Sequence, residues 1–399
     1  MNNYHNSVLL QQVLDNLGIY TAGIYTAGID TKNGNTGDIS KERIYVDMTL
    51  GGGGVSLKII ENLQKGIEQG RFKEATLVSI DVDSDACLNF RKLLDKHFKN
   101  VIHKDTYILV GNVRVYIVNS NFRDIKSILS HIKIKSNESG SNGSRSKGSR
   151  SKVNGIVYDL GLSSFQIDNP DKGFSYSENS ELDMRMDKHL KVKASDLLNG
   201  LYEDELYNIF TKYGEEPFSR IIAKNIIKKR KEKEIVTSDE LVRIISSSVP
   251  RARISVPRNL DSRNLDSRDL GPRNKAYLYH HVSRIFQALR IAVNDELGAL
   301  FDSLHQVPEI LEHGGRVEII SFHSLEDRIV KNFFKEWIPQ GSKPKGSKPK
   351  RSISKDNKEF ISLYKKPIIP GVLEIKENSR ARSAKLRVYE YIGPRSTDI

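Results

Sequence analysis

The first half of the chain alternates between two hydrophobic periodicities. Apolar runs rich in strand-forming residues occupy positions 43–50, 75–81, 113–122 and 155–161, and each run predicts a strand. Segments with apolar residues at helical spacing lie before and between them, at 7–17, 55–67, 85–98 and 125–132. Because each strand is almost continuously apolar, we expect both faces of the sheet to be covered. The pattern therefore predicts a Rossmann-like α/β core, a mainly parallel sheet with helices on both faces.

The second half begins with a long stretch of helical spacing. Helices are expected within 194–233, over 238–249 with Thr237 or Ser238 as the cap, and over 280–307. Strand patterns return at 314–322 and 383–392. We interpret this as one α/β core, formed by residues 1–177 and 280–399, that is interrupted by a helical insert over residues 178–279.

Charge and composition narrow the class of partner. The formal net charge is +13, and a basic balance of this size suits a polyanion, either nucleic acid or an anionic membrane surface. No apolar run is long enough to cross a bilayer, and MNNYHNSVLL does not look like a signal peptide. We therefore expect a cytoplasmic protein with a nucleic-acid partner and no membrane association.

A single cysteine, Cys87, excludes an intramolecular disulfide and a cysteine-based zinc site. Its place near an expected helix start allows a reactive thiol, but a small buried residue is the favoured interpretation.

Four pentapeptides occur as adjacent pairs: GIYTA at 18–27, GSRSK at 143–152, RNLDS at 258–267 and GSKPK at 341–350. A period of five residues is too short for a solenoid repeat. Duplication tolerated in surface loops is the favoured interpretation, because lengthening a loop costs little. Extra contacts from the basic pairs to an RNA backbone are the alternative.

The strongest local signal is a glycine-rich turn after the first strand. Asp47 ends that strand, and Gly51, Gly52, Gly53 and Gly54 follow within a few residues. A run of glycines lets the main chain approach a ligand closely. The acid stands first and the glycines are crowded, unlike G-x-G-x-x-G, which favours S-adenosylmethionine over a dinucleotide. Asp81 ends the second strand, where a carboxylate can accept hydrogen bonds from both ribose hydroxyls of an adenosine ligand.

Asp159 ends the fourth strand and opens the segment DLGLSSFQ. Loops at the carboxyl ends of parallel strands bind ligands, and in methyltransferases that act on exocyclic amines this loop meets donor and amine. Cytosine N4 is a poor nucleophile because its lone pair is delocalised into the ring. Catalysis therefore needs an aligned amine and acceptors for its N–H groups, which Asp159 and loop carbonyls could supply. The alternative is that Asp159 caps the next helix.

Nine stretches of the chain resemble the RsmH (MraW) family of bacterial small-subunit ribosomal RNA methyltransferases, in the family's order. They are HNSVLL (5–10), DMTLGGGGVS (47–56), SIDVD (79–83), DLGLSSFQIDNPDKGFSY (159–176), LDMRMD (182–187), YGEEPFSRIIAKNI (213–226), RIFQALRIAVNDEL (284–297), GGRVEIISFHSLEDRIVK (314–331) and NSRARSAKLR (378–387). The resemblance implies S-adenosyl-L-methionine as cofactor and N4 of a P-site cytidine in 16S rRNA of the small ribosomal subunit as target. It also implies that the helical insert recognises the substrate, and that the protein can pair as a homodimer.

The resemblance also implies the site residues. Cofactor contacts are expected from Gly53, Gly54, Val55, Asp81, Phe122, Asp159 and Gln166, with Phe122 near the adenine and Asp159 as the catalytic candidate. Val55 departs from the family, which usually has His at this position, so only a main-chain contact is expected there.

Three other groups have competing interpretations. His323, Glu326 and Asp327 could suggest a metal or acid–base site, but Ser324 is expected to cap a helix there, and no second His at ligand spacing supports a metal. Asp183 and Asp187 could close over the active site or belong to a packed loop with an internal ion pair. Arg380, Arg382 and Arg387 are phosphate-binding candidates.

Three other classes of protein are weighed against the methyltransferase. A DNA amino-methyltransferase would usually carry a Pro-Pro-aromatic signature where this chain has Asp159-Leu-Gly-Leu. A non-enzymatic RNA-binding or assembly factor is left open by Val55. A nicotinamide-dependent oxidoreductase is disfavoured by the glycine spacing.

Overall fold

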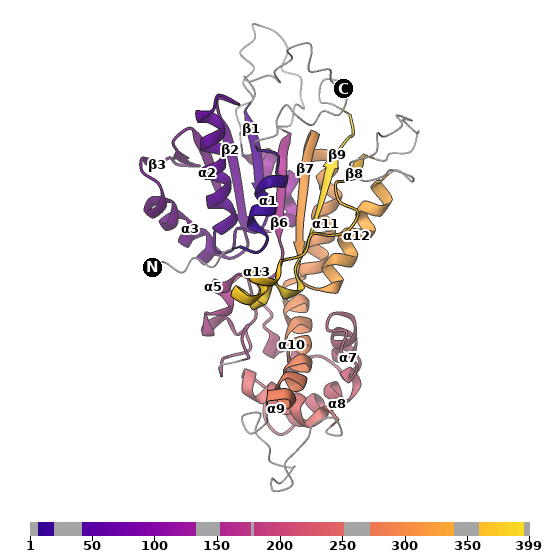
Figure 1. Cartoon of the computed structure of the whole chain (residues 1–399). Coiled ribbons are helices and arrows are strands. Elements are labelled where there is room, and N and C mark those ends of the chain that lie inside the picture. The colour runs from indigo at the N-terminus through magenta and orange to yellow at the C-terminus, as the bar shows by residue number, and fades with distance from the viewer. Residues whose placement is uncertain are drawn as a thin grey trace. The chain divides into compact units, whose positions relative to one another are not determined.

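The computed structural model describes residues 7–19, 42–132, 152–176, 179–250, 272–338 and 359–394 (Figure 1). It forms two compact units. Residues Met1–Gly161 with Leu297–Ile399 make the first, which we term the sheet unit, and Leu162–Glu296 make the second, the helical unit. The division of the core at residues 177 and 280, and the recognition role of the insert, remain predictions. The pentapeptide pairs lie outside the described residues, apart from Gly18, Ile19 and Lys152.

Nine strands of the described residues form one mixed sheet in the order β3-β4-β5-β2-β1-β6-β7-β9-β8. Its five central strands, β5, β2, β1, β6 and β7, are parallel. The strands are β1 (Arg43–Asp47), β2 (Ala75–Asp81), β3 (Val101–His103), β4 (Ile108–Val110), β5 (Val113–Asn119), β6 (Val153–Asp159), β7 (Leu311–Ser321), β8 (Phe360–Ser362) and β9 (Lys385–Tyr391). The predicted Rossmann-like, mainly parallel core is confirmed, with antiparallel strands added at both edges.

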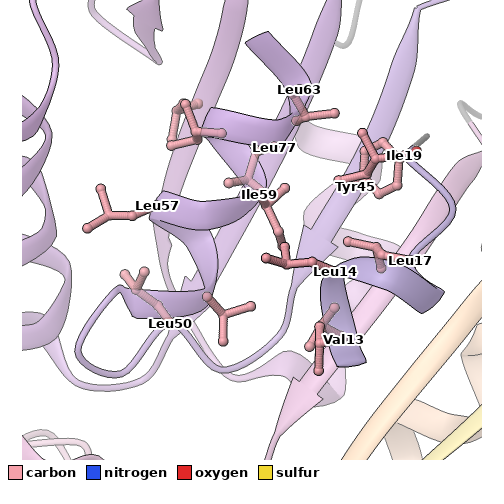
Figure 2. Close-up of a cluster of buried hydrophobic side chains, with 14 of the residues drawn as sticks. Val13, Leu14, Leu17, Ile19, Tyr45, Leu50, Leu57, Ile59, Leu63 and Leu77 are labelled. Carbon is pink, nitrogen blue, oxygen red and sulfur yellow. The ribbon is translucent and has the colours of Figure 1, made fainter. Parts of the chain in front are cut away.

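Helices cover both faces of the sheet because the central strands are apolar on both sides. One face packs against α1 (Leu10–Asn16), α2 (Gly54–Glu68) and α3 (Ser84–His97). Figure 2 shows part of this core, which contains Val13 and Leu14 of α1, Ile59 and Leu63 of α2, and Tyr45 of β1. The other face packs against α4 (Ile125–His131), α11 (Glu296–Ile310) and α12 (Ser324–Trp337).

The helical unit has a hydrophobic core of its own. Its helices are α5 (Ser164–Ile167), α6 (Ala194–Gly200), α7 (Glu203–Lys212), α8 (Ser219–Arg230), α9 (Ser238–Ser248) and α10 (Pro272–Asn294). Fully buried side chains at helical spacing, such as Phe210 of α7, Ile222 of α8 and Leu289 of α10, form this core. Thr237 caps α9, with a reciprocal bond between its main chain and Glu240, which decides between the two predicted caps.

The long helix predicted over residues 280–307 is wrong in its extent. It begins at Pro272 and ends at Asn294, and a second helix, α11, begins at Glu296. The break falls at Asp295, whose φ of 48° is left-handed and cannot continue a right-handed helix. The apolar periodicity continues across the break, so spacing alone did not indicate it.

The LDMRMD segment is a packed loop with an internal ion pair, as one of the two interpretations predicted. Arg185 donates from Nε to Oδ1 of Asp183 at 2.7 Å and from Nη2 to Oδ2 at 2.8 Å. Asn294 Nδ2 donates to the main-chain oxygen of Met184 at 2.7 Å, which ties the loop to α10. Asp187 instead accepts the main-chain N–H of His189.

Cys87 is buried in the first core, 6% exposed, and burial beside the acidic Asp81 and Asp83 raises the pKa of its thiol to about 12. A thiol that stays protonated is a poor nucleophile, so the interpretation as a small buried residue is confirmed. Among the described helices, none is both long and apolar enough to span a membrane.

A buried ion pair joins the two antiparallel strands β7 and β9. Arg316 Nε lies 3.1 Å from Glu390 Oε2, and Arg316 Nη1 donates to the main-chain oxygen of Asn16 at 2.6 Å. Both side chains of the pair are about nine-tenths buried. The guanidinium therefore fastens the end of α1 to the edge of the sheet.

We predict that Glu390→Ala destabilises the protein by about 3 kcal/mol, because it leaves the buried Arg316 without its carboxylate. The double variant Arg316→Met/Glu390→Met should recover most of this loss. Urea unfolding followed by circular dichroism measures both. Equal losses in the single and the double variant would show that the two charges are not coupled.

Candidate active site

Asp47 supports the turn that follows β1. Its side chain is fully buried; Oδ1 accepts the main-chain N–H of Thr49 at 3.1 Å, and Oδ2 accepts the Ser56 hydroxyl at 2.7 Å. Ser56 also contacts the hydroxyl of Ser79 on β2 at 2.7 Å. Burial raises the pKa of Asp47 to about 6, and the Ser56 and Thr49 bonds oppose that rise. With both oxygens occupied, Asp47 fixes the start of α2 against the sheet.

The glycine turn takes backbone conformations that L-residues rarely adopt. Gly51 and Gly53 have φ values of 50° and 81°. A Cβ on Gly53 would lie 2.4 Å from the ring of Phe90, so this glycine is needed for packing against α3 as well as for its conformation. A Cβ on Gly52 would meet nothing within 4 Å, so the turn is open there. The main chain at Gly52 is therefore where a ligand can come closest.

The two residues that open α2 differ in what they offer a ligand. Gly54 is the first residue of the helix, and Val55 follows it with its side chain only 4% exposed, within the first core cluster. A ligand can therefore use only main-chain N–H groups here, and those of Gly51 and Gly53 are already bonded to Asp81 and to the main-chain oxygen of Leu50. The first N–H groups of a helix have no partner within the helix, which leaves those at the start of α2.

Asp81, at the end of β2, holds the turn from the other side. Its Oδ2 accepts the N–H of Gly51 at 2.7 Å, and its Oδ1 accepts the N–H of Asp83 at 2.9 Å. Burial raises the pKa of this carboxyl to about 6, against the effect of these two bonds. Each carboxylate oxygen has a second lone pair, so Asp81 can still accept two hydroxyl donors.

Phe122 follows β5 and opens a short 3₁₀ turn, Phe122–Asp124, capped by the Asn121 side chain. Its ring meets Tyr158 of β6 edge to face, with centroids 5.8 Å apart and planes at 87°. Tyr158 in turn hydrogen-bonds Ser303 through its hydroxyl at 2.7 Å. Phe122 is partly exposed, so one side of the ring remains available beside the ends of β5 and β6.

Asp159, at the end of β6, has the least satisfied carboxyl of the three strand-end acids. Its main-chain N–H donates to the Thr49 hydroxyl at 2.7 Å, which ties the end of β6 to the turn after β1. Its Oδ1 is buried and has no hydrogen-bond partner among the described residues. Burial and the neighbouring acids Asp47 and Glu326 raise the pKa of Asp159 to about 7. Oδ1 is therefore a hydrogen-bond acceptor without a donor, and the carboxyl loses its proton only as the pH approaches about 7.

His323 and Glu326 form the start of α12 beside this acid. The cap is His323 and not Ser324: its Nδ1 accepts the Glu326 N–H at 3.3 Å, and Glu326 Oε2 accepts the N–H groups of Phe322 and His323. His323 Nε2 also lies 3.1 Å from Glu326 Oε1. The prediction of Ser324 as cap is wrong, because the imidazole fills the role that a hydroxyl usually takes. No group of three possible metal ligands occurs in the described parts of the chain.

Gln166 lies in the helical unit, in α5, and is buried there. Its Oε1 accepts the N–H of Ser163 at 3.1 Å. The predicted cofactor residues of the sheet unit lie at the carboxyl ends of β1, β2, β5 and β6 or directly after them, and their contacts with a cofactor, like that of Gln166, stay predictions.

The strand order explains why these residues come together at the carboxyl ends of the parallel strands. From β1 the chain first adds β2 and β5 on one side, then crosses to place β6 and β7 on the other. Ligands of open α/β sheets bind at the carboxyl ends of the strands where the order reverses, which here lies between β1 and β6. The predicted residues Gly53, Gly54, Val55 and Asp159 flank this point, with Asp81 one strand away.

The residues at this edge fit S-adenosylmethionine. Its ammonium and sulfonium groups are cationic, and the edge presents carboxyls whose pKa values are raised by burial and, for Asp81 and Asp159, also by neighbouring acids. Its ribose needs acceptors, which Asp81 retains, and its amino-acid tail needs an open main chain, which Gly52 provides. The unpartnered Asp159 Oδ1 leaves an acceptor for a second molecule.

Two contributors could not be identified from the sequence. Thr49 is a common residue type, and nothing in its spacing indicated a bond to β6. Gly52 stood in the glycine run, but only the structure separates it, as the open position, from the tightly packed Gly53. Glu326 was visible only as part of a possible metal or acid–base group, and its effect on Asp159 depends on how β7 places α12.

A Rossmann-like sheet with this glycine turn, strand-end carboxyls and an unpartnered acceptor defines an S-adenosylmethionine-dependent methyltransferase. A model of the MraW methylase family matches residues 2–392. The chain belongs to the MraW methylase family.

Two solved structures are also similar over most of the chain. One is SMU.1697c from Streptococcus mutans, in complex with SAH, at 10% identity and a TM-score of 0.32, covering 88% of this chain and 90% of that one. The other is a rRNA methylase from Streptococcus thermophilus, at 9% identity and a TM-score of 0.30, covering 89% of each chain. At these TM-scores neither structure adds to the assignment, which rests on the family match.

We predict that replacing Gly53 by alanine affects stability, whereas the same replacement at Gly52 affects cofactor binding. Gly53→Ala should lower the free energy of unfolding by about 1–3 kcal/mol, because its Cβ would overlap Phe90 and its φ is positive. Gly52→Ala should leave unfolding almost unchanged and weaken cofactor binding instead. Urea unfolding and isothermal titration with S-adenosylhomocysteine separate the two effects. If Gly52→Ala binds as wild type does, the ligand does not approach this position.

We predict that the difference in stability between wild type and Asp159→Asn depends on pH. Its pKa is raised in the folded state, so the folded protein holds the proton more tightly, and stability falls as pH rises from about 4 through about 7. Asp159→Asn removes this loss and should raise the melting temperature more at pH 8 than at pH 5. Asp105→Asn, at an exposed position, is the matched control. The same gain at both pH values would contradict the raised pKa.

Proposed function

We propose that this MraW-family methylase transfers a methyl group from S-adenosylmethionine to N4 of a cytidine in ribosomal RNA, and that the target is the P-site cytidine of 16S rRNA. The observation that carries the proposal is the unpartnered, buried Asp159 Oδ1 at the switch point of the sheet. The resemblance to the family across nine stretches supports the small ribosomal subunit as the substrate, and the net charge of +13 suits an RNA partner. A cytoplasmic location and a homodimer stay predictions.

Asp81 would hold the ribose hydroxyls of the cofactor, and the open main chain from Gly52 to Val55 would hold its amino-acid tail. Phe122 would lie against the adenine, and Gln166 would contribute from the helical unit. When bound, S-adenosylmethionine supplies a methyl group made electrophilic by its attachment to a sulfonium.

Asp159 would orient the target amine. An N4 amine has two N–H donors and a lone pair delocalised into the ring, so it must be held by acceptors to present nitrogen in line with the methyl. Oδ1 of Asp159 is an acceptor at this edge that no donor within the described ranges satisfies. In the balanced reaction a bond would form from N4 to the methyl carbon while the bond from that carbon to the sulfonium sulfur breaks, which would leave S-adenosylhomocysteine, and one amine proton would pass to Asp159.

The pKa of about 7 lets Asp159 take up that proton near neutrality. The carboxylate that orients the amine is therefore also the acceptor for the proton that leaves it. Glu326 and Asp47 contribute through their charges, which raise the proton affinity of Asp159. Thr49 positions the end of β6 that carries it.

A methyl-transfer assay tests this function. Wild type, Asp159→Ala and Asp81→Ala would be incubated with labelled S-adenosylmethionine and small subunits that lack the modification, and the nucleoside identified by mass spectrometry. Asp159→Ala should lower kcat by about 10²–10⁴-fold while cofactor affinity stays within tenfold. Asp81→Ala should instead weaken cofactor affinity by about tenfold or more, because two charge-assisted hydrogen bonds are lost.

Asp105→Ala, at an exposed position on the β3–β4 hairpin, is the control and should behave as wild type. Cofactor binding without transfer would favour a non-enzymatic assembly factor. A labelled product other than N4-methylcytidine would contradict the proposed target and leave the methylase assignment intact.

A further inference from the structure

A short segment that precedes β9 lies at the same end of the sheet as Asp159, where the parallel strands have their carboxyl ends. In β7, Ile320 is paired with Asp159 on one side and with Leu386 of β9 on the other. Leu386 is therefore two strands from Asp159, about 10 Å away. The chain reaches β9 through α13 (Val372–Glu377) and the 3₁₀ turn Ser379–Ser383. Figure 1 shows α13 at this edge of the sheet. We term residues 364–383 the rim segment.

Large apolar side chains of the rim segment are turned to solvent. Val372, Leu373 and Ile369 are 84%, 77% and 66% exposed, and they are three of the four most exposed large hydrophobic residues in the described ranges. Exposed apolar residues scattered singly are ordinary, but three within five positions form a patch. The segment is nevertheless anchored, because Glu374 Oε1 accepts the N–H of Leu9 at 2.7 Å and Ile368 exchanges two main-chain bonds with Leu386.

The rim segment also carries more cations than acids. Ala381 is fully buried in the first core, so its neighbours Arg380 and Arg382 are both exposed. Lys365, Lys366 and Lys376 are exposed as well, and against these five cations the rim segment has two acids, Glu374 and Glu377. The excess of positive charge suits a polyanion that also has apolar surface.

The neighbouring cations of β9 are committed elsewhere. Asp327 Oδ1 accepts Nε of Arg387 at 2.7 Å, and Asp327 Oδ2 lies 3.3 Å from Lys385 Nζ. These partners hold the pKa of Asp327 below its usual value. Arg387, one of the three arginines expected to bind phosphate, is therefore a structural residue that fastens α12 to β9, whereas Arg380 and Arg382 remain candidates.

We propose that the rim segment binds unpaired RNA beside the target nucleotide, with Arg380 and Arg382 on phosphates and the Val372–Leu373 tip against the base left exposed by extrusion of the target. This inference rests on the proposed function. A base that is modified must leave its stack, and the gap exposes the apolar face of its neighbour. Proteins fill such gaps with aliphatic or aromatic side chains. Exposed aliphatic side chains and exposed arginines, on a segment that leads into β9 beside the end of β6, match both needs of that neighbour.

Two double variants test the two halves of the surface: Val372→Ser/Leu373→Ser and Arg380→Gln/Arg382→Gln. The matched controls are Ile102→Ser and Lys99→Gln/Lys104→Gln, which alter exposed residues on the β3 hairpin, at the opposite edge of the sheet. Full-length protein would be titrated into a fluorescent single-stranded RNA that contains one cytidine, at several salt concentrations. The same RNA annealed to its complement would be measured in parallel, as would methyl transfer to small subunits.

The arginine variant should weaken binding of both RNAs and reduce the slope of log K against log salt by about 1.4, or 0.7 per lost phosphate contact on a single strand. The apolar variant should weaken only single-stranded RNA, by about tenfold, with the slope unchanged. Losses no larger than those of the controls, with methyl transfer intact, would overturn the rim proposal alone. A changed sedimentation coefficient with unchanged RNA binding would also overturn it, in favour of contact with a second copy of the chain. If wild type itself transfers no methyl, the proposed function fails instead.

Discussion

The structure depends on the register of three adjacent parallel strands, which brings three carboxyls to one edge of the sheet. Asp47 is paired with Ser79 on one side and with Val157 on the other. Asp81 and Asp159 each lie two residues beyond these partners, so all three acids are on the same face of the sheet, because side chains alternate with a period of two. Burial makes these acids hold their protons more tightly, neighbouring acids add to the effect at Asp81 and Asp159, and the three pKa values rise to between about 6 and 7.

The three acids differ in how many hydrogen-bond donors the protein gives them, and these differences define their roles in the site. Asp47 is satisfied by the Thr49 N–H and the Ser56 hydroxyl, so it serves the fold. Asp81 takes two main-chain N–H groups and keeps acceptor capacity. Asp159 Oδ1 takes none. A buried acceptor without a donor is costly, and at the end of β6, beside the open glycine turn, a bound ligand can complete the bond. The family of the chain is a methylase family, and a cationic methyl donor with an amine substrate would complete it.

The parts of the fold with long periodic signals could be predicted from the sequence. The five parallel strands and the helices between them follow from apolar runs of seven or more residues. The hairpin of β3 and β4 and the edge strand β8 could not, because three-residue strands are too short to show a period. The break at Asp295 was missed because the apolar spacing continues through it. Glu318 lies fully buried in β7 with neither carboxylate oxygen bonded, which no strand propensity indicates.

Residue types indicated the candidate site, but geometry decided the roles within it. A run of glycines and acids at the ends of predicted strands can be recognised in the sequence, and the family resemblance assigned them to a cofactor. Whether a glycine is open to a ligand or pressed against Phe90 depends on how α3 packs, as the contrast of Gly52 with Gly53 shows. Likewise the structural role of Arg387 follows from its ion pair with Asp327, a residue 60 positions away. Tertiary contacts of this kind leave no local pattern in the sequence.

Proton release on cofactor binding tests the central claim, that the clustered carboxyls hold a cationic methyl donor. Titration calorimetry of S-adenosylmethionine at pH 6.5, in two buffers of different ionisation enthalpy, gives the number of protons released. Carboxyls with pKa values of about 6 to 7 should ionise when a cation binds beside them, so protons should be released. Fewer should be released with the uncharged thioether S-adenosylhomocysteine, and fewer in Asp159→Asn. Tight binding of both ligands with no proton released would contradict the account.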